Sequence, residues 1–251
     1  MKTLVIANQK GGVGKSTVSV HLVWRAIEKG LRVLLVDFDG QANSTHTFIE
    51  DIEPNGAHAS HLFSKKKCPK PHAINDQLSI VPADIGINDV EGLALEAIEH
   101  PAAHLRKWEK DYDLCIIDTP PNLGRRLLAA LIASDAVVSP MALNGYSIDG
   151  LTELQRSIIT VKKNFNPRLK NLGVLPNLVN QRSKTQATRL EELRRLLGDK
   201  VLPYVLPSRV AVSDAIDNGH PVWKRARGQS AGKAAKEMRH VVNTVIERAM
   251  K

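Results

Sequence analysis

The sequence predicts a single α/β domain over residues 1–251, with a mostly parallel, twisted sheet covered by helices on both faces. Three observations lead to this prediction. Short, β-branched apolar runs alternate along the chain with longer amphipathic stretches, a pattern that favours right-handed βαβ units. The apolar runs are continuous, which is typical of strands buried on both faces. The length of 251 residues is enough for one domain with its own core.

Seven apolar runs are predicted to be strands, and four periodic stretches to be helices. The strands are Thr3–Ala7, Arg32–Asp37, Leu78–Pro82, Leu114–Asp118, Ala136–Pro140, Leu172–Pro176 and Val201–Val205. The helices, with an apolar residue every three or four positions, are Lys15–Lys29, Gly150–Phe165, Ala187–Leu197 and Ala231–Met250. The least organised region is Glu50–Gln77, which contains a basic stretch interrupted by prolines. We expect this region to be a solvated surface loop rather than a DNA contact.

Positive charge is concentrated near the C-terminus. The formal net charge is +9. Residues 1–181 contain 20 Lys and Arg against 19 Asp and Glu, whereas the basic C-terminal portion, residues 182–251, contains 15 against 7. Most basic runs are simply solvated, but an asymmetry of this size also points to a polyanionic partner, such as DNA or an anionic membrane.

Cysteine usage and hydropathy indicate the compartment. The two cysteines, Cys68 and Cys115, do not have the spacing of a metal site or a redox pair. Cys115 lies in an apolar run and is predicted to be a buried thiol. No apolar stretch approaches the roughly 20 residues that span a bilayer, and Met1–Ala7 is too short for a signal peptide. We therefore expect a reducing, cytoplasmic location.

A glycine-containing loop joins the first predicted strand to the first predicted helix. It reads Lys10-Gly11-Gly12-Val13-Gly14-Lys15-Ser16-Thr17. Glycines allow backbone N–H groups to surround phosphate oxygens, and the helix N-terminus adds its dipole. Lys15 is placed to reach the β- and γ-phosphates, and the Ser16 hydroxyl to bind Mg²⁺. The standard P-loop motif would begin with Gly at position 9; Gln9 stands there, followed by Lys10, so the loop fits the deviant Walker A form.

Two further predicted strands end in carboxylates. Asp37 and Asp39 lie two positions apart at the end of one strand, and Asp118 ends another. Ligands bind α/β sheets at the carboxyl ends of the strands. We therefore expect Asp39 and Asp118 to lie beside the glycine loop, with Asp118 in the Walker B position for Mg²⁺.

Together, these segments resemble the ParA/MinD family of partition and positioning ATPases, and most closely the short, plasmid-type ParA partition ATPases. The resemblance covers nearly the whole chain. It extends to the stretch from Ser139 through Tyr146 to Leu151, and to residues 173–177, 205–210 and 219–224. A longer ParA subtype carries an N-terminal helix-turn-helix domain, for which this chain has no room. Operator-specific DNA binding is therefore not expected.

The resemblance implies roles for individual residues. Lys15 would bind phosphate, Lys10 would reach the ATP of a partner subunit, and Asp39 would position the attacking water. Mg²⁺ would be served by Ser16, Asp39 and Asp118. The nucleotide-binding residues would be Lys10, Gly11, Gly12, Val13, Gly14, Lys15, Ser16, Thr17 and Asp118, with Asn177, Pro207 and Ser208 at the adenine. The family has Pro where this chain has Gly40, which loosens the expected geometry of Asp39.

The resemblance also implies a nucleotide-driven switch. ATP with Mg²⁺ would hold two subunits face to face as a homodimer, which would bind double-stranded DNA without sequence preference. A ParB-type centromere-binding partner would stimulate hydrolysis and release the dimer, so the protein would be cytoplasmic and nucleoid-associated, with no membrane contact. Salt-sensitive phosphate contacts would supply the affinity. The candidate DNA contacts are Arg189, Arg194, Arg195, Arg209, Lys224, Arg225, Arg227, Lys233 and Lys236.

Three other functions compete with this one. A MinD-like ATPase needs an amphipathic membrane-binding tail, but the apolar face of Ala231–Met250 lacks aromatic residues and is predicted to pack on the sheet. An electron-transfer ATPase like the nitrogenase iron protein needs cysteines for an iron–sulfur cluster, which Cys68 and Cys115 do not supply. A nucleoid-riding ATPase that positions a protein cargo stays open, because cargo choice lies in the partner.

Overall fold

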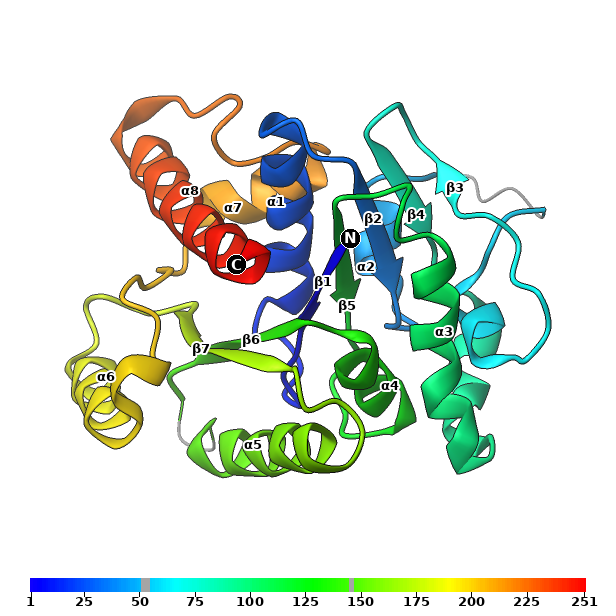
Figure 1. Cartoon of the computed structure of the whole chain (residues 1–251). Coiled ribbons are helices and arrows are strands. Elements are labelled where there is room, and N and C mark those ends of the chain that lie inside the picture. The colour runs from blue at the N-terminus through cyan, green and yellow to red at the C-terminus, as the bar shows by residue number, and fades with distance from the viewer. Residues whose placement is uncertain (51–54, 145–146) are drawn as a thin grey trace.

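The computed structural model describes residues 1–50, 55–144 and 147–251, without the side chains of 147–150. In this part of the chain, seven strands form one sheet (Figure 1). In spatial order they are β3 (His72–Ala73), β4 (Leu78–Val81), β2 (Val33–Asp37), β5 (Leu114–Asp118), β1 (Lys2–Ile6), β6 (Ala136–Ala142) and β7 (Lys170–Asn177). Neighbouring strands pair in parallel, except for β3 and β4. The predicted α/β fold with a mostly parallel sheet is therefore confirmed.

Helices occupy most of the segments between strands. They are α1 (Lys15–Glu28), α2 (Asn43–His46), α3 (His100–Lys107), α4 (Arg125–Ala133), α5 (Ser147–Asn164), α6 (Lys184–Leu197), α7 (Val210–Asp217) and α8 (Gly228–Met250). The 3₁₀ helices are η1 (Ala59–Phe63), η2 (Ile85–Gly92), η3 (Leu95–Glu99) and η4 (Gly198–Lys200). The four predicted helices are confirmed as α1, α5, α6 and α8. The last three begin three residues earlier than predicted, which is less than one turn.

Separate cores lie on the two faces of the sheet. Consecutive strand residues point to opposite faces, and both faces are apolar here: Leu4 and Leu35 belong to one core, and Val5 and Leu34 to the other. Helices α1, α7 and α8 close the first core, and α3, α4 and α5 close the second (Figure 1). The apolar face of α8 is buried there, as predicted. Among the described residues, no helix has both the length and the apolar character to cross a bilayer.

One predicted strand is wrong. The segment Val201–Val205 lies beside β7, but Val201 forms only an isolated parallel bridge with Val174. Pro203 has no N–H to donate, so a continuous hydrogen-bond ladder cannot run through this segment. Its residues Val201 and Leu202 are buried beside β7 without forming a strand.

The region 50–77 is more ordered than predicted. Its described part contains η1, whose Leu62 and Phe63 are buried in a core, and the edge strand β3. The basic residues Lys65, Lys66 and Lys67 are exposed, as expected for a surface loop. A 3₁₀ helix and a two-residue strand are too short to give a periodic signal, so the sequence pattern did not reveal them.

The carboxyl ends of three central strands meet at one edge of the sheet. Ile6 on β1 pairs with Asp118 on β5, and Asp118 pairs with Asp37 on β2. Neighbouring strands lie roughly 4.8 Å apart, so the register itself brings Asp37 and Asp118 together. The loops that follow these strands therefore share one space.

Candidate functional site

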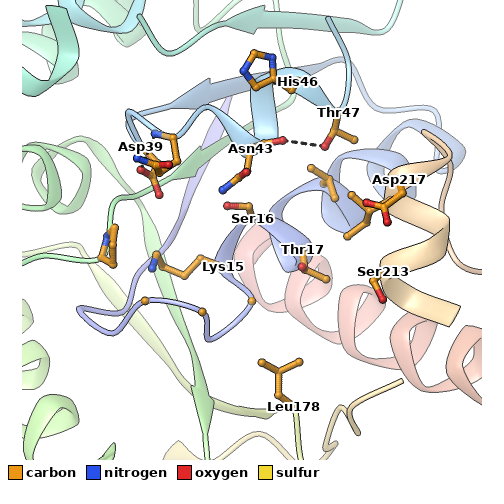
Figure 2. A pocket seen from close by; sticks show the side chains of 17 residues that line it. Lys15, Ser16, Thr17, Asp39, Asn43, His46, Thr47, Leu178, Ser213 and Asp217 are labelled. Atoms are coloured by element: carbon orange, nitrogen blue, oxygen red, sulfur yellow. Dashed lines mark hydrogen bonds between the residues drawn. The ribbon is translucent and has the colours of Figure 1, made fainter. Parts of the chain in front are cut away.

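A cavity of about 670 Å³ opens where these loops meet (Figure 2). The loop before α1 forms one wall, the segment after β2 a second, and α7 with Leu178 a third. Its lining residues include Gly11, Gly12, Gly14, Lys15, Ser16, Thr17, Asp39, Gln41, Asn43, Pro121 and Ser213. Figure 2 shows Lys15, Ser16 and Asp39 projecting into the same space. The structure thus brings two separate predicted motifs together in one site.

The path of the glycine loop explains its glycines. Gly12 and Gly14 have φ angles of 68° and 83°, in the left-handed region that favours glycine. A Cβ at Gly14 would also lie 2.4 Å from Nδ2 of Asn177. That amide donates a hydrogen bond of 2.7 Å to the carbonyl of Val13. Asn177, predicted to contact adenine, therefore also fixes the path of the loop.

Lys15 is a buried cation at the floor of the cavity. Only 6% of the residue is exposed, and its Nζ donates to the carbonyl of Lys10 at 3.3 Å. Burial lowers the pKa of Lys15, while the nearby carboxylates of Asp118 and Asp39 raise it. A buried ammonium group is stable only beside hydrogen-bonding or anionic partners. The cavity therefore favours an anionic ligand such as a phosphate group.

Asp37 and Asp118 form a buried pair of carboxyl groups behind the loop. Burial, and then the charge of Asp118, raises the pKa of Asp37 to about 8. Burial also raises the pKa of Asp118, against hydrogen bonds from the hydroxyls of Ser16, Ser44 and Ser19. Two ionised carboxylates this close destabilise each other. A bound cation would remove that repulsion.

This donor set fits Mg²⁺. The Ser16 hydroxyl and the Asp118 carboxylate offer the hard oxygen donors that this ion prefers. No group of three or more acidic, His or Cys side chains suited to a metal occurs within residues 1–50, 55–144 and 147–251. A cation here would complete its coordination with water and phosphate oxygens, as Mg²⁺ does in phosphoryl-transfer sites.

The sequence pattern did not assign a role to Asp37, Ser44 or Thr45. Oδ2 of Asp37 accepts hydrogen bonds from the backbone N and the Oγ1 of Thr45, at 3.0 and 2.8 Å. The Ser44 hydroxyl donates to Oδ2 of Asp118. The sequence did contain a signal that Asp37 lies at the site, because Asp37 and Asp39 are two positions apart at the end of a predicted strand. No spacing rule links Ser44 to Asp118, which lies 74 residues away.

Asp39 lies at the cavity wall, oriented by its own loop. Its backbone N donates to Oδ1 of Asp37 at 3.0 Å, and its Oδ1 accepts from the backbone N of Gln41 at 3.1 Å. The residue is 8% exposed, and its side chain faces the cavity (Figure 2). A carboxylate held in this way can accept a hydrogen bond from a water molecule in the cavity.

The Lys10 side chain is held outside the cavity of its own chain. It is not among the residues that line the cavity. Its Nζ donates to Oδ1 of Asn144 at 2.5 Å, and its backbone N donates to Oδ1 of Asn8 at 2.9 Å. Tyr146, in the stretch that the family resemblance includes, lies outside the described residues.

The predicted adenine contacts gather around a second cavity of about 200 Å³. Asn177, Pro207 and Ser208 all line it. This cavity shares Thr17, Leu178 and Ser213 with the first one. The two cavities are therefore contiguous, one beside the glycine loop and the other beside the proposed base contacts.

The predicted DNA contacts fall into two groups. Arg189, Arg194 and Arg195 lie on α6, and Lys224, Arg225, Arg227, Lys233 and Lys236 lie on α8 or just before it (Figure 1). All of these except Arg189 are exposed. Arg209 differs, because its guanidinium group pairs with Glu237 through two N–O distances of 2.6 Å and is largely buried. Its charge is neutralised within the chain.

Comparisons with known proteins identify the family of this chain. A family model described as an AAA domain matches residues 1–171. The chain is 37% identical over 256 residues to protein IncC of Escherichia coli, covering 98% of this chain and 69% of IncC. It is 32% identical over 258 residues to the chromosome partitioning protein ParA of Caulobacter vibrioides, covering 95% and 94% of the two chains.

A solved structure shares the fold. Cobyrinic acid a,c-diamide synthase from Mycobacterium smegmatis, with a bound ATP analogue and magnesium, has a TM-score of 0.81 and 26% identity. The match covers 98% of this chain and 94% of that chain. The predicted resemblance is confirmed by the relatives and by the shared fold: the chain belongs to the ParA/MinD family of P-loop ATPases.

Proposed function

We propose that this chain is a Mg²⁺-dependent DNA partition ATPase that converts ATP and water to ADP and phosphate. The observation that carries the proposal is the convergence of Lys15, Ser16, Asp39 and Asp118 at one edge of the sheet. A relative named for chromosome partitioning supports the cellular role.

Each of these groups has a part in hydrolysis. The N–H groups of the glycine loop and the Lys15 ammonium bind the phosphates. Ser16 and Asp118 would hold Mg²⁺, which neutralises phosphate charge when bound. Asp39 accepts a hydrogen bond from the attacking water and orients it toward the γ-phosphorus. A new P–O bond forms as the bond to the bridging oxygen breaks, which releases ADP and inorganic phosphate.

ATP also controls pairing of two chains. In the single chain, Asn144 holds the Lys10 ammonium outside the cavity. In a face-to-face homodimer, Lys10 would exchange this contact for a phosphate oxygen of the partner's ATP. Because ADP lacks the γ-phosphate, ATP favours the dimer and ADP does not.

A homodimer would carry two copies of the basic surface formed by α6 and by the residues beside α8. The exposed residues on α6 and those beside α8 would contact the phosphates of double-stranded DNA without reading its sequence. A ParB-type partner would stimulate hydrolysis and release the dimer from the nucleoid. A nucleoid-riding ATPase that positions a protein cargo would use the same site and differ in its partner. Burial of the apolar face of α8 disfavours a MinD-like membrane anchor formed by that helix.

A mobility-shift titration on two unrelated duplexes tests the proposal, together with a phosphate-release assay. We expect tight binding to both duplexes with ATP, weak binding with ADP, and a strong loss of affinity at higher salt. Equal binding with ADP and ATP would refute the switch, and a strong preference for one duplex would indicate an operator-reading protein. ATP-dependent binding to liposomes without DNA binding would favour the MinD-like alternative.

A further inference from the structure

The Asn88 side chain lies against Gly40, in the loop that carries Asp39. A Cβ on Gly40 would lie 2.5 Å from Oδ1 and 2.8 Å from Nδ2 of Asn88. These distances are far below ordinary contact, so the Asn88 amide occupies space that only glycine leaves free. Asn88 belongs to η2, which is remote in sequence from the loop. The proline that the family has at position 40 would displace this amide.

A buried arginine extends the contact to the backbone before Asp39. Arg126, on α4, is 6% exposed. Its Nη1 donates to the carbonyl of Phe38 at 3.3 Å and to Oδ1 of Asn88 at 3.0 Å. Its Nε donates to Oε1 of Glu91 at 2.9 Å. A single rigid guanidinium group therefore joins η2 to the residue that directly precedes Asp39.

Glu91 accepts hydrogen bonds both from the Arg126 guanidinium group and from the first turn of α4. Its Oε2 accepts a hydrogen bond of 2.6 Å from the backbone N of Arg125, the first residue of α4. A carboxylate at a helix N-terminus is stabilised by the free N–H groups there. Because α4 follows the loop after Asp118, η2 connects the loop that carries Asp39 with the loop that follows Asp118.

We propose that Asn88 and Arg126 are positioning residues for ATP hydrolysis, which act by fixing the Phe38–Gly40 backbone and thus the Asp39 carboxylate. Neither residue lines the nucleotide cavities, so their effect falls on turnover rather than on ATP binding. A small displacement of a water-orienting group lowers the rate strongly. The inference rests on the proposed function, because it requires that Asp39 positions the attacking water.

The main test is Asn88→Ala, a change at an exposed residue that does not disturb the core. We expect kcat to fall roughly tenfold, with KM and ATP affinity unchanged within about twofold. Asp89→Ala, an exposed neighbour on η2, is the matched control and should keep wild-type turnover. Arg126→Lys, which keeps the charge but not the forked geometry, should also lower kcat, with a melting temperature recorded to verify folding.

Gly40→Ala and a double-variant cycle sharpen the test. The added methyl group displaces Asn88, so Gly40→Ala should lower kcat like Asn88→Ala. The double variant should be no slower than Asn88→Ala alone, because both changes break one contact. In an Asp39→Ala background, Asn88→Ala should have no further effect on kcat.

Three outcomes would overturn the inference: wild-type kcat in Asn88→Ala, a rise in KM in place of a fall in kcat, or an undiminished Asn88→Ala effect in the Asp39→Ala background. Failure of the proposed function looks different. In that case the wild-type chain releases no phosphate from ATP, or Asp39→Ala keeps full turnover.

Discussion

The nucleotide site and the basic C-terminal portion hold their charges in opposite surroundings. At the site, Lys15, Asp37 and Asp118 are buried, and each has defined charge or hydrogen-bond partners. In the C-terminal portion, basic residues such as Lys224 and Arg225 are exposed. A buried charge depends on its few neighbours, whereas an exposed one is screened by water and salt. We therefore expect one substitution to have a large effect at the nucleotide site. In the basic C-terminal portion, we expect function to depend on the combined charge of many residues.

Lys15→Ala should give the largest effect. It removes the buried cation beside the phosphates, so we expect ATP affinity to fall roughly a thousandfold, or about 4 kcal/mol. ATP-dependent dimerisation should be lost as well. Titration with a fluorescent ATP analogue and sizing chromatography measure both effects. Lys29→Ala, at the exposed end of α1, is the matched control. Unchanged ATP affinity in Lys15→Ala would remove Lys15 from the phosphate site.

His21 is hydrogen-bonded both to Thr17, at the nucleotide site, and to Val222, in the basic C-terminal portion. It should control the stability of the protein in acid. It is fully buried. The Val222 N–H donates to Nε2 at 3.3 Å, so Nδ1 carries the proton and donates to the Thr17 carbonyl at 2.7 Å. Burial lowers the pKa of His21 from 6.5 to about 4. The unfolded chain therefore binds a proton below about pH 6.5 that the folded chain rejects until about pH 4.

The free energy of unfolding should accordingly decrease as the pH is lowered. His21 alone should contribute a decrease of about 2 kcal/mol between pH 7 and pH 5. Urea unfolding at the two pH values measures this change. In His21→Gln, which stays neutral, the pH dependence should shrink by that amount, since the other titrating groups contribute equally to both proteins. Identical pH dependence in the two proteins would show that His21 is already protonated in the fold at pH 5.

Lys10→Ala should separate nucleotide binding from pairing. The variant should bind ATP with wild-type affinity, because Lys10 does not line the cavity of its own chain. Its dimer should dissociate roughly thirtyfold more readily, or about 2 kcal/mol, because a phosphate contact to the partner subunit is lost. Sedimentation with ATP measures this constant, again beside Lys29→Ala. Wild-type dimerisation would place Lys10 outside the interface.

Substitutions in the basic portion should have the smallest single effects. Lys224→Ala, Arg225→Ala and Arg227→Ala should each weaken DNA binding by about twofold, and the three together roughly tenfold, while dimerisation persists. The salt dependence of binding should also decrease in the triple variant. The matched control is the triple alanine variant of Lys65, Lys66 and Lys67, which are also exposed. An equal loss in the control would show that net charge, rather than its location, determines binding.

The same contrast separates what the sequence could predict from what it could not. The glycine loop was predictable because a positive φ at Gly12 and Gly14 requires glycine. Asp39 and Asp118 were predictable because parallel strands end at one edge of the sheet. Ser44, Asn88 and Arg126 were not, since each meets a partner that no sequence spacing indicates.

Two further differences have the same physical origin. The DNA contact predicted at Arg209 was based on charge alone, and charge does not reveal that Glu237 on α8 pairs with it. Helices α3, α4 and α7 were not predicted, because eight or nine residues give too few turns for a periodic signal. The ends of the parallel strands were thus predictable from the sequence, whereas individual side-chain pairs between distant segments were not.

An open strand at the edge of a sheet is a template on which other chains can aggregate. β7 is the last strand of this sheet. Leu202 and Leu206 donate backbone hydrogen bonds of 2.8 and 2.9 Å to the carbonyls of β7, so the neighbouring segment covers the edge. Pro203 and Pro207 offer no N–H to a further strand. This segment therefore leaves the β7 edge of the sheet closed to a strand from another chain.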